Sequence, residues 1–194
     1  YPKIEADGDN AAKEVTNATT SFTVEANQEE ELNYMKSDLM WVGKTAVART
    51  TEDVELEFHH LMAKMTVSVT AKEGVLVKSI SLMNVIREVA ITELSASQYQ
   101  LGDLATVSDA EQKTIMLAST EETTVNNSLS GSALFPGQTI SGNFIKVETN
   151  FGDAYFSVTD KEFVKGSEYS ADLVVKRQDI GYVSSIADWE NNGG

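Results

Sequence analysis

The chain has 194 residues, enough to bury a hydrophobic core without stabilising disulfides or metals. It contains no cysteine, which excludes disulfides, thiolate metal sites and cysteine nucleophiles within this chain. Thirty acidic residues against fifteen basic ones give a net charge of −15, which argues against nucleic acid as a partner because a polyphosphate needs a basic surface.

The N-terminal residues show neither the basic region nor the apolar stretch of a signal peptide. No segment approaches the roughly 18 apolar residues that a membrane-spanning helix needs. Because Tyr1-Pro2 does not resemble a natural beginning, we expect that a targeting segment has been removed from the chain.

One segment near the N-terminus is compatible with a short helix. Within "NQEEELNYMKSDLM" (27–40), Leu32, Met35 and Leu39 stand at helical spacing, and Asn27 is a candidate N-cap. A second candidate start, Ser108 with Glu111 in the pattern of a capping box, is followed by only one turn before β-type residues resume.

The clearest strand signal contains a reversal of faces. Leu56 and Phe58 alternate with glutamates, which would place even-numbered side chains on the core. From Leu61 to residue 70 the odd-numbered side chains are the apolar ones instead. The switch falls on His59 and His60, so we expect a bulge, a bend or a crossover between domains there.

The rest of the chain is typical of an all-β protein, with many Thr, Ser and Val residues and only two prolines. We expect "FPGQ" (135–138) to form a turn, and Phe151-Gly152 to close a hairpin. The spacing favours a β-sandwich. Further strands are predicted at 75–85, 87–94, 99–107, 113–119, 139–150, 153–159, 168–178 and 179–189.

No pattern in the sequence indicates catalysis. His59 and His60 are the only histidines, and neighbouring strand residues point to opposite faces, so a shared metal ion is not expected. The chain has no nucleophile or phosphate-binding motif. The acidic run at 29–31 is interpreted as a solvated face. We therefore predict a protein that is not an enzyme and has no catalytic, metal-binding or cofactor-binding residues.

A set of short motifs in order resembles one protein family. The signature is Phe58-x-His60-Leu61-x-Ala63-Lys64, which precedes an alternating strand. With its neighbours it resembles the fimbrillin-like proteins of Bacteroides-type bacteria, the Mfa-like group of the fimbrillin superfamily. The other motifs are "FTVEANQ" (22–28), "SDLMWV" (37–42), "SISLMNV" (79–85), "ALFPGQT" (133–139), "FVKGSEYSADLVV" (163–175) and "SSIADWENNGG" (184–194).

The resemblance implies a fold of transthyretin-like β-sandwich domains of the Greek-key type. Residues 1–55 would be the remainder of an N-terminal β domain, and 56–194 a C-terminal β-sandwich domain. Within the signature, Phe58, His60, Ala63 and Lys64 would have a structural role. The chain departs from the family in lacking most of the N-terminal domain and the lipoprotein signal with its cysteine.

The family also implies a function: a non-enzymatic fimbrial subunit (stalk, tip or anchor) for adhesion and fimbria assembly, exported to the cell surface or outer membrane. Its partners would be other fimbrial subunits and a host or bacterial surface ligand, and it would meet the membrane only through a lipid anchor that this chain lacks. Assembly would proceed by donor-strand exchange. The alternative is a secreted glycan-binding β-sandwich module that uses exposed aromatic residues such as Tyr99, Tyr155 or Trp41.

The C-terminal segment is the candidate assembly strand. It places Ile180, Tyr182 and Ile186 in alternation, followed by Trp189. Such a strand either completes its own sheet or is donated to a neighbouring subunit. We expect self-completion, because only five residues follow Trp189 and leave little reach toward a partner.

Overall fold

The structure is a computed structural model of the chain. It describes residues 20–41, 58–91, 93–94, 100–101, 105–106, 111–178, 181–187 and 191–192.

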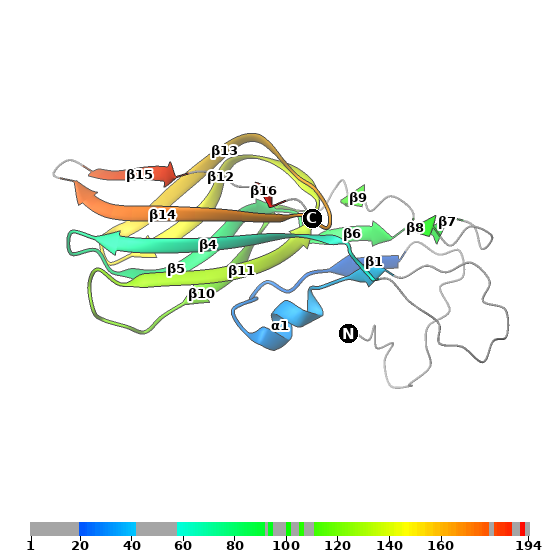
Figure 1. The fold of residues 1–194 in the computed structure, drawn as a ribbon, viewed down its shortest axis with the longest axis horizontal. Coiled ribbons are helices and arrows are strands. Elements are labelled where there is room, and N and C mark those ends of the chain that lie inside the picture. The colour runs from blue at the N-terminus through cyan, green and yellow to red at the C-terminus, as the bar shows by residue number, and fades with distance from the viewer. Residues whose placement is uncertain are drawn as a thin grey trace.

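Two sheets packed face to face form the body of the molecule, as the sequence predicts (Figure 1). The first has the order β10-β5-β12-β13, comprising Lys113–Ser119, Val77–Val85, Gln138–Thr149 and Gly152–Phe163. The second has the order β11-β4-β14-β15, comprising Ser128–Pro136, Met62–Lys72, Glu168–Gln178 and Gly181–Ala187. In the second sheet β4 and β14 run parallel, and β16 (Asn191–Asn192) pairs with the start of β14.

Smaller elements lie beyond one end of the sandwich (Figure 1). A three-stranded sheet has the order β1-β6-β9, which comprises Thr20–Thr23, Glu88–Ile91 and Ala105–Thr106. Two further pairs join β2 (Met40–Trp41) to β3 (His59–His60), and β7 (Glu93–Leu94) to β8 (Gln100–Leu101). The helix α1 spans Glu31–Lys36.

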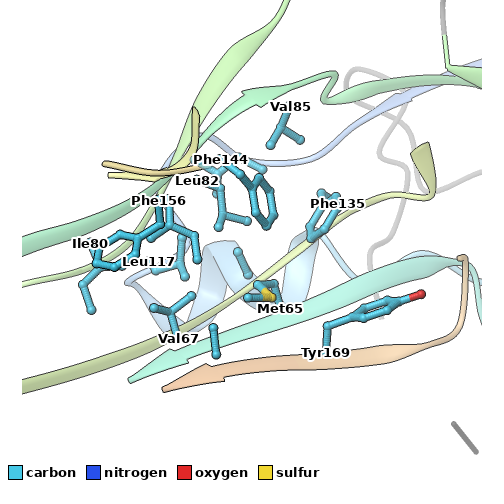
Figure 2. Close-up of a cluster of buried hydrophobic side chains, with 14 of the residues drawn as sticks. Met65, Val67, Ile80, Leu82, Val85, Leu117, Phe135, Phe144, Phe156 and Tyr169 are labelled. Carbon is cyan, nitrogen blue, oxygen red and sulfur yellow. The ribbon is translucent and has the colours of Figure 1, made fainter. Parts of the chain in front are cut away.

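The core between the two sheets comes from the period-two alternation of the strands. Odd-numbered residues of β4, such as Met65 and Val67, are fully buried, and Ile80 and Leu82 of β5 face them (Figure 2). One end of the core is aromatic: Phe135, Phe144, Phe163 and Tyr169 lie with ring centroids 4.8 to 6.1 Å apart. Such edge-to-face pairs add about 0.5–1.5 kcal/mol each beyond the burial of area.

The reversal at the two histidines is a change of partners. His59 and His60 pair with β2, whereas β4 begins at Met62 and pairs with β11 and β14. Between them, the Leu61 amide donates to the Leu39 carbonyl at 2.9 Å. Two expectations were wrong here. Phe58 was expected to face the core but is 42% exposed, and Met62 was expected to face solvent, as an even-numbered residue of this strand, but is buried.

The helix forms where expected but buries a different face. Leu32 and Met35 are 61% and 51% exposed, while Tyr34 packs against the core cluster. The N-cap position is Glu30, so the prediction of Asn27 was wrong; the Asn27 side chain instead accepts a hydrogen bond from the Glu29 amide. The Ser108 capping box lies outside the described residues.

The segment before "FPGQ" is a strand that the sequence did not reveal. β11 runs through Pro136 and β12 begins at Gln138, so Gly137 alone separates them. Because β11 and β12 belong to different sheets, this point is a crossing between sheets rather than a hairpin turn. The hairpin at Phe151-Gly152 is confirmed, since β12 and β13 pair up to Thr149 and Gly152.

Gly131 marks the place where β11 passes closest to β10. A Cβ atom at this position would lie 2.5 Å from the backbone oxygen of Leu117. We therefore expect Gly131→Ala to lower the free energy of unfolding by about 1–3 kcal/mol, because neither backbone can move without straining its sheet. Urea unfolding measures the change. Ser130→Ala, on the exposed face beside it, is the control and should shift stability by less than about 0.5 kcal/mol; equal stability of the two variants would contradict the prediction.

Candidate functional site

The signature residues divide between the core and a polar cluster at the start of β4. Ala63 is fully buried between the sheets. His60 lies with Nδ1 2.8 Å from an Asp38 carboxylate oxygen, and the Lys64 ammonium lies 3.0 Å from a Glu168 carboxylate oxygen. His60 and Lys64 therefore line one cavity, of about 220 Å³, on the outer face of the five-stranded sheet.

The charges of this cluster are set by its pairing. The hydrogen bond to Glu168 raises the pKa of the Lys64 ammonium above its usual value. Because the folded pKa is raised, the stabilising contribution is complete at neutral pH and is lost only as the pH rises through that pKa. Burial raises the pKa of the Tyr34 hydroxyl, which lies between the pairs and stays protonated at neutral pH.

The segment before α1 seals the neighbouring sheet edges, and we call its residues 24–29 the strap. Gln28 is only 3% exposed. Its side-chain amide donates to the Leu134 carbonyl and accepts from the Leu134 amide, both at 2.8 Å. The strap thereby supplies the partner that the outer edge of β11 would otherwise lack.

The same strap also pairs with β10, the edge strand of the other sheet. The Gln28 amide donates to the Met116 carbonyl, and the Met116 amide donates to the Ala26 carbonyl. The Glu29 carboxylate accepts hydrogen bonds from both the amide and the hydroxyl of Ser119 at 2.8 to 2.9 Å. One side of the sandwich is therefore closed across both sheets. The acidic run at 29–31 is exposed, as expected for a solvated face, and Glu29 is in addition bonded to β10.

Two further amide side chains pair with backbone in the same two-bond manner. Gln138 accepts from the Ile86 amide and donates to the Ile86 carbonyl at 2.9 and 3.0 Å. Asn127 does the same with Val77, at 2.9 Å for both bonds. No pattern in the sequence indicated these roles, although Gln28 and Gln138 lie inside motifs of the family.

The opposite side of the five-stranded sheet ends at β15, the candidate assembly strand. Its backbone pairs antiparallel with β14 of the same chain, with Tyr182 opposite Arg177 and Ile186 opposite Leu173. Ile180 and Trp189 lie outside the described residues. Among the elements that the structure describes, no segment equivalent to the strap covers the outer edge of β15.

Of the three aromatic residues named for a glycan platform, the described part of the structure includes the side chain of Tyr155. Tyr155 on β13 is 42% exposed, and its hydroxyl donates to Asp153. Tyr99 lies outside the described residues, and the side chain of Trp41 is likewise not described. Within the described ranges no three His, Asp or Glu side chains gather in a way that could hold a metal ion.

Two solved structures of low sequence identity share the fold of this chain. A candidate cell adhesion protein from Bacteroides uniformis is 16% identical, with a TM-score of 0.62 over 93% of this chain and 71% of that one. Another from Bacteroides ovatus is 14% identical, with a TM-score of 0.61 over 97% of this chain and 65% of that one. The chain thus spans about two thirds of the length of these proteins.

The sequence itself identifies the family. The model of the fimbrillin-like family matches residues 8–189, and the chain belongs to this family. No curated protein matches the sequence.

Family membership indicates a structural, non-enzymatic protein of a cell-surface appendage that associates with other fimbrial subunits. No described helix is long and apolar enough to cross a membrane.

Because one buried side-chain amide holds the strap on β11, we expect its replacement to lower the stability of the protein strongly. In Gln28→Leu the N–H and C=O groups of Leu134 lose their partner while remaining buried, so we expect the free energy of unfolding to fall by about 2–4 kcal/mol. Denaturant unfolding measures this change. Gln112→Leu is the matched control, because Gln112 is exposed and should change stability by less than about 0.5 kcal/mol. A Gln28→Leu variant as stable as this control would contradict the proposed sealing.

We also expect metal removal to leave the protein unaffected. A metal ion that binds only the folded state stabilises that state by mass action, so its removal lowers the melting temperature. Because we expect no such metal ion, EDTA should leave the melting temperature unchanged. The measurement is thermal unfolding with and without EDTA at constant ionic strength. A large fall in melting temperature would reveal a metal site that the described residues do not contain.

Proposed function

We propose that this protein is a fimbrial subunit that joins its neighbours by strand exchange at the edge of β14. The observation that carries the proposal is the difference between the two sides of the sandwich. On one side the strap is bonded to β10 and β11 through Gln28 and Glu29. On the other side β14 has β15 as its only partner besides β4 and the two-residue β16.

Strand exchange at this edge follows from ordinary sheet energetics. β14 exposes a row of N–H and C=O groups toward β15, and any strand of matching alternation can satisfy them. Leu173 and Val175 of β14 are buried, so the edge also carries core side chains that an incoming strand must help to cover. In the free subunit β15 closes its own sheet. In the fimbria the equivalent strand of a neighbour replaces it, and in this the proposal departs from the expectation of self-completion drawn from the sequence.

The family's organisation supports three further parts of the proposal. Residues 1–55 come from an N-terminal domain, of which the strap and α1 pack on the sandwich, and residues 56–194 form a transthyretin-like, Greek-key C-terminal domain. The protein is exported and anchored at the outer membrane through a lipid. It serves as a stalk, tip or anchor subunit and contacts a host or bacterial surface.

Removing residues 179–194 tests the assembly edge. Burying three large apolar side chains contributes about 5 kcal/mol at about 1.5–3 kcal/mol each, so we expect the truncated chain to lose most of its stability. A synthetic peptide of residues 179–194 should bind the truncated chain and restore a cooperative thermal transition. A scrambled peptide of the same composition is the control.

Two results would contradict strand exchange at β14. A truncated chain that keeps its full stability and binds no peptide would show that the edge is not an acceptor. A truncated chain that joins wild-type fibres as readily with the peptide bound as without it would show that subunits meet elsewhere.

A further inference from the structure

A second cavity lies beside the cavity that His60 and Lys64 line, and Tyr34 borders both. It measures about 540 Å³ and is lined by the strap, α1, β10 and β11, with Glu29, Glu31 and Ser130 among its residues. Tyr34 and Lys64 line both cavities. We call the two cavities together the Tyr34 groove, which lies on the outer face of the five-stranded sheet and extends past β11 to β10 of the other sheet.

The polar groups of the groove are held in place by their neighbours. Lys64 is bonded to Glu168 and His60 to Asp38, as described above. The hydroxyls of Ser132 and Thr66 lie 2.8 Å apart across β11 and β4. Donors and acceptors that are already oriented lose little conformational entropy when a ligand binds, so they are well suited to recognising hydroxyl groups.

Next to these polar groups the groove exposes part of two apolar residues, the half-buried Tyr34 and Leu129. Leu117, Met62 and Leu134 also border the two cavities, but they are at most 5% exposed and form the floor beneath a ligand. A sugar ring has the matching character, because its hydroxyl groups form a polar rim around an apolar face of C–H groups that stacks on aromatic rings.

Charge narrows the class of ligand. The carboxylates of Glu29, Glu31, Asp38 and Glu168 line the groove, together with Lys64 and His60. With a net charge of −15 on the whole chain, sialylated and other acidic glycans are repelled. Ligand pockets usually have volumes of about 300–1,000 Å³, and the two cavities together are larger than the smallest of these pockets. An uncharged ligand of several linked units fits this space.

We propose that the Tyr34 groove binds a neutral oligosaccharide. Lys64, Glu168, Asp38 and His60 bond to its hydroxyl groups, and the Tyr34 ring stacks on one sugar face. This site goes beyond the proposed role as a fimbrial subunit, because it gives the subunit a ligand of its own. It also differs from a platform built on Tyr155, which lies on β13 in the other sheet.

An array of neutral and sialylated oligosaccharides, probed with the whole chain, tests the proposal. We expect binding to neutral members only, with affinities then measured by calorimetry. Tyr34→Leu and Glu168→Gln should each weaken binding at least about tenfold, equivalent to about 1.4 kcal/mol. Glu168 is exposed, so its variant keeps the fold even if the loss of the Tyr34 ring disturbs the helix. Tyr155→Leu is the matched control and should bind as the wild type does.

The same variants separate this proposal from strand exchange. The Glu168→Gln variant should still join fibres, and its truncated form should still bind the peptide of residues 179–194. The reason is that the groove and β15 do not share residues. The proposal is overturned if no neutral oligosaccharide binds, if sialylated ones bind as tightly, or if Glu168→Gln binds normally. Loss of binding in Tyr155→Leu alone would assign recognition to the other sheet.

Discussion

Backbone groups at the ends and edges of the two sheets must find partners, and buried side-chain amides supply them. A glutamine or asparagine amide carries one acceptor and a donor in the same spacing as a peptide group, so it can take the place of a strand. Gln28 does this for Leu134, Gln138 for Ile86 and Asn127 for Val77. As a result, the backbone N–H and C=O groups at these positions all have hydrogen-bond partners. The loss of one such partner would cost about 1–3 kcal/mol.

The position of Gln28 determines much of the surrounding structure. Because its amide holds the strap on β11, α1 lies over the outer face of the sheet and Tyr34 packs there. The chain then returns through Leu39 beside Leu61, so β3 cannot continue straight into β4 with the same partners. The reversal of faces at His59 and His60 follows from this change of neighbours. It is also why signature residues border a groove instead of lying wholly in the core.

The sequence was sufficient where periodicity decides the structure. The alternation from Leu61 to residue 70 predicted β4, and the patterns at 113–119 and 168–178 predicted β10 and β14 with the observed bounds. The strand β11 was not predicted, because its outward-facing serines at 128, 130 and 132 alternate with no clear apolar pattern and Gly131 and Pro136 are typical of turns. Its glycine is required by the close passage of β10, which no local pattern can reveal.

The site was less predictable because its contacts are long-range. Gln28 and Leu134 are separated by 106 residues, and Lys64 and Glu168 by 104. Amphipathic spacing in α1 pointed to Leu32 and Met35, yet a helix of six residues is oriented by the strap rather than by its own apolar stripe. Tyr34, which the spacing left aside, became the packed residue.

The two proposed surfaces occupy separate parts of one sheet. In the order β11-β4-β14-β15, the larger cavity of the Tyr34 groove reaches β11, whereas the proposed strand exchange concerns the edge of β14 that β15 covers. The strap closes the β10 and β11 edges, so a donated strand has no comparable edge to enter there. β14 contacts both regions, through Glu168 at its start and through its long edge with β15, and its parallel pairing with β4 does not depend on β15. The two proposed functions therefore do not compete for the same part of the sheet.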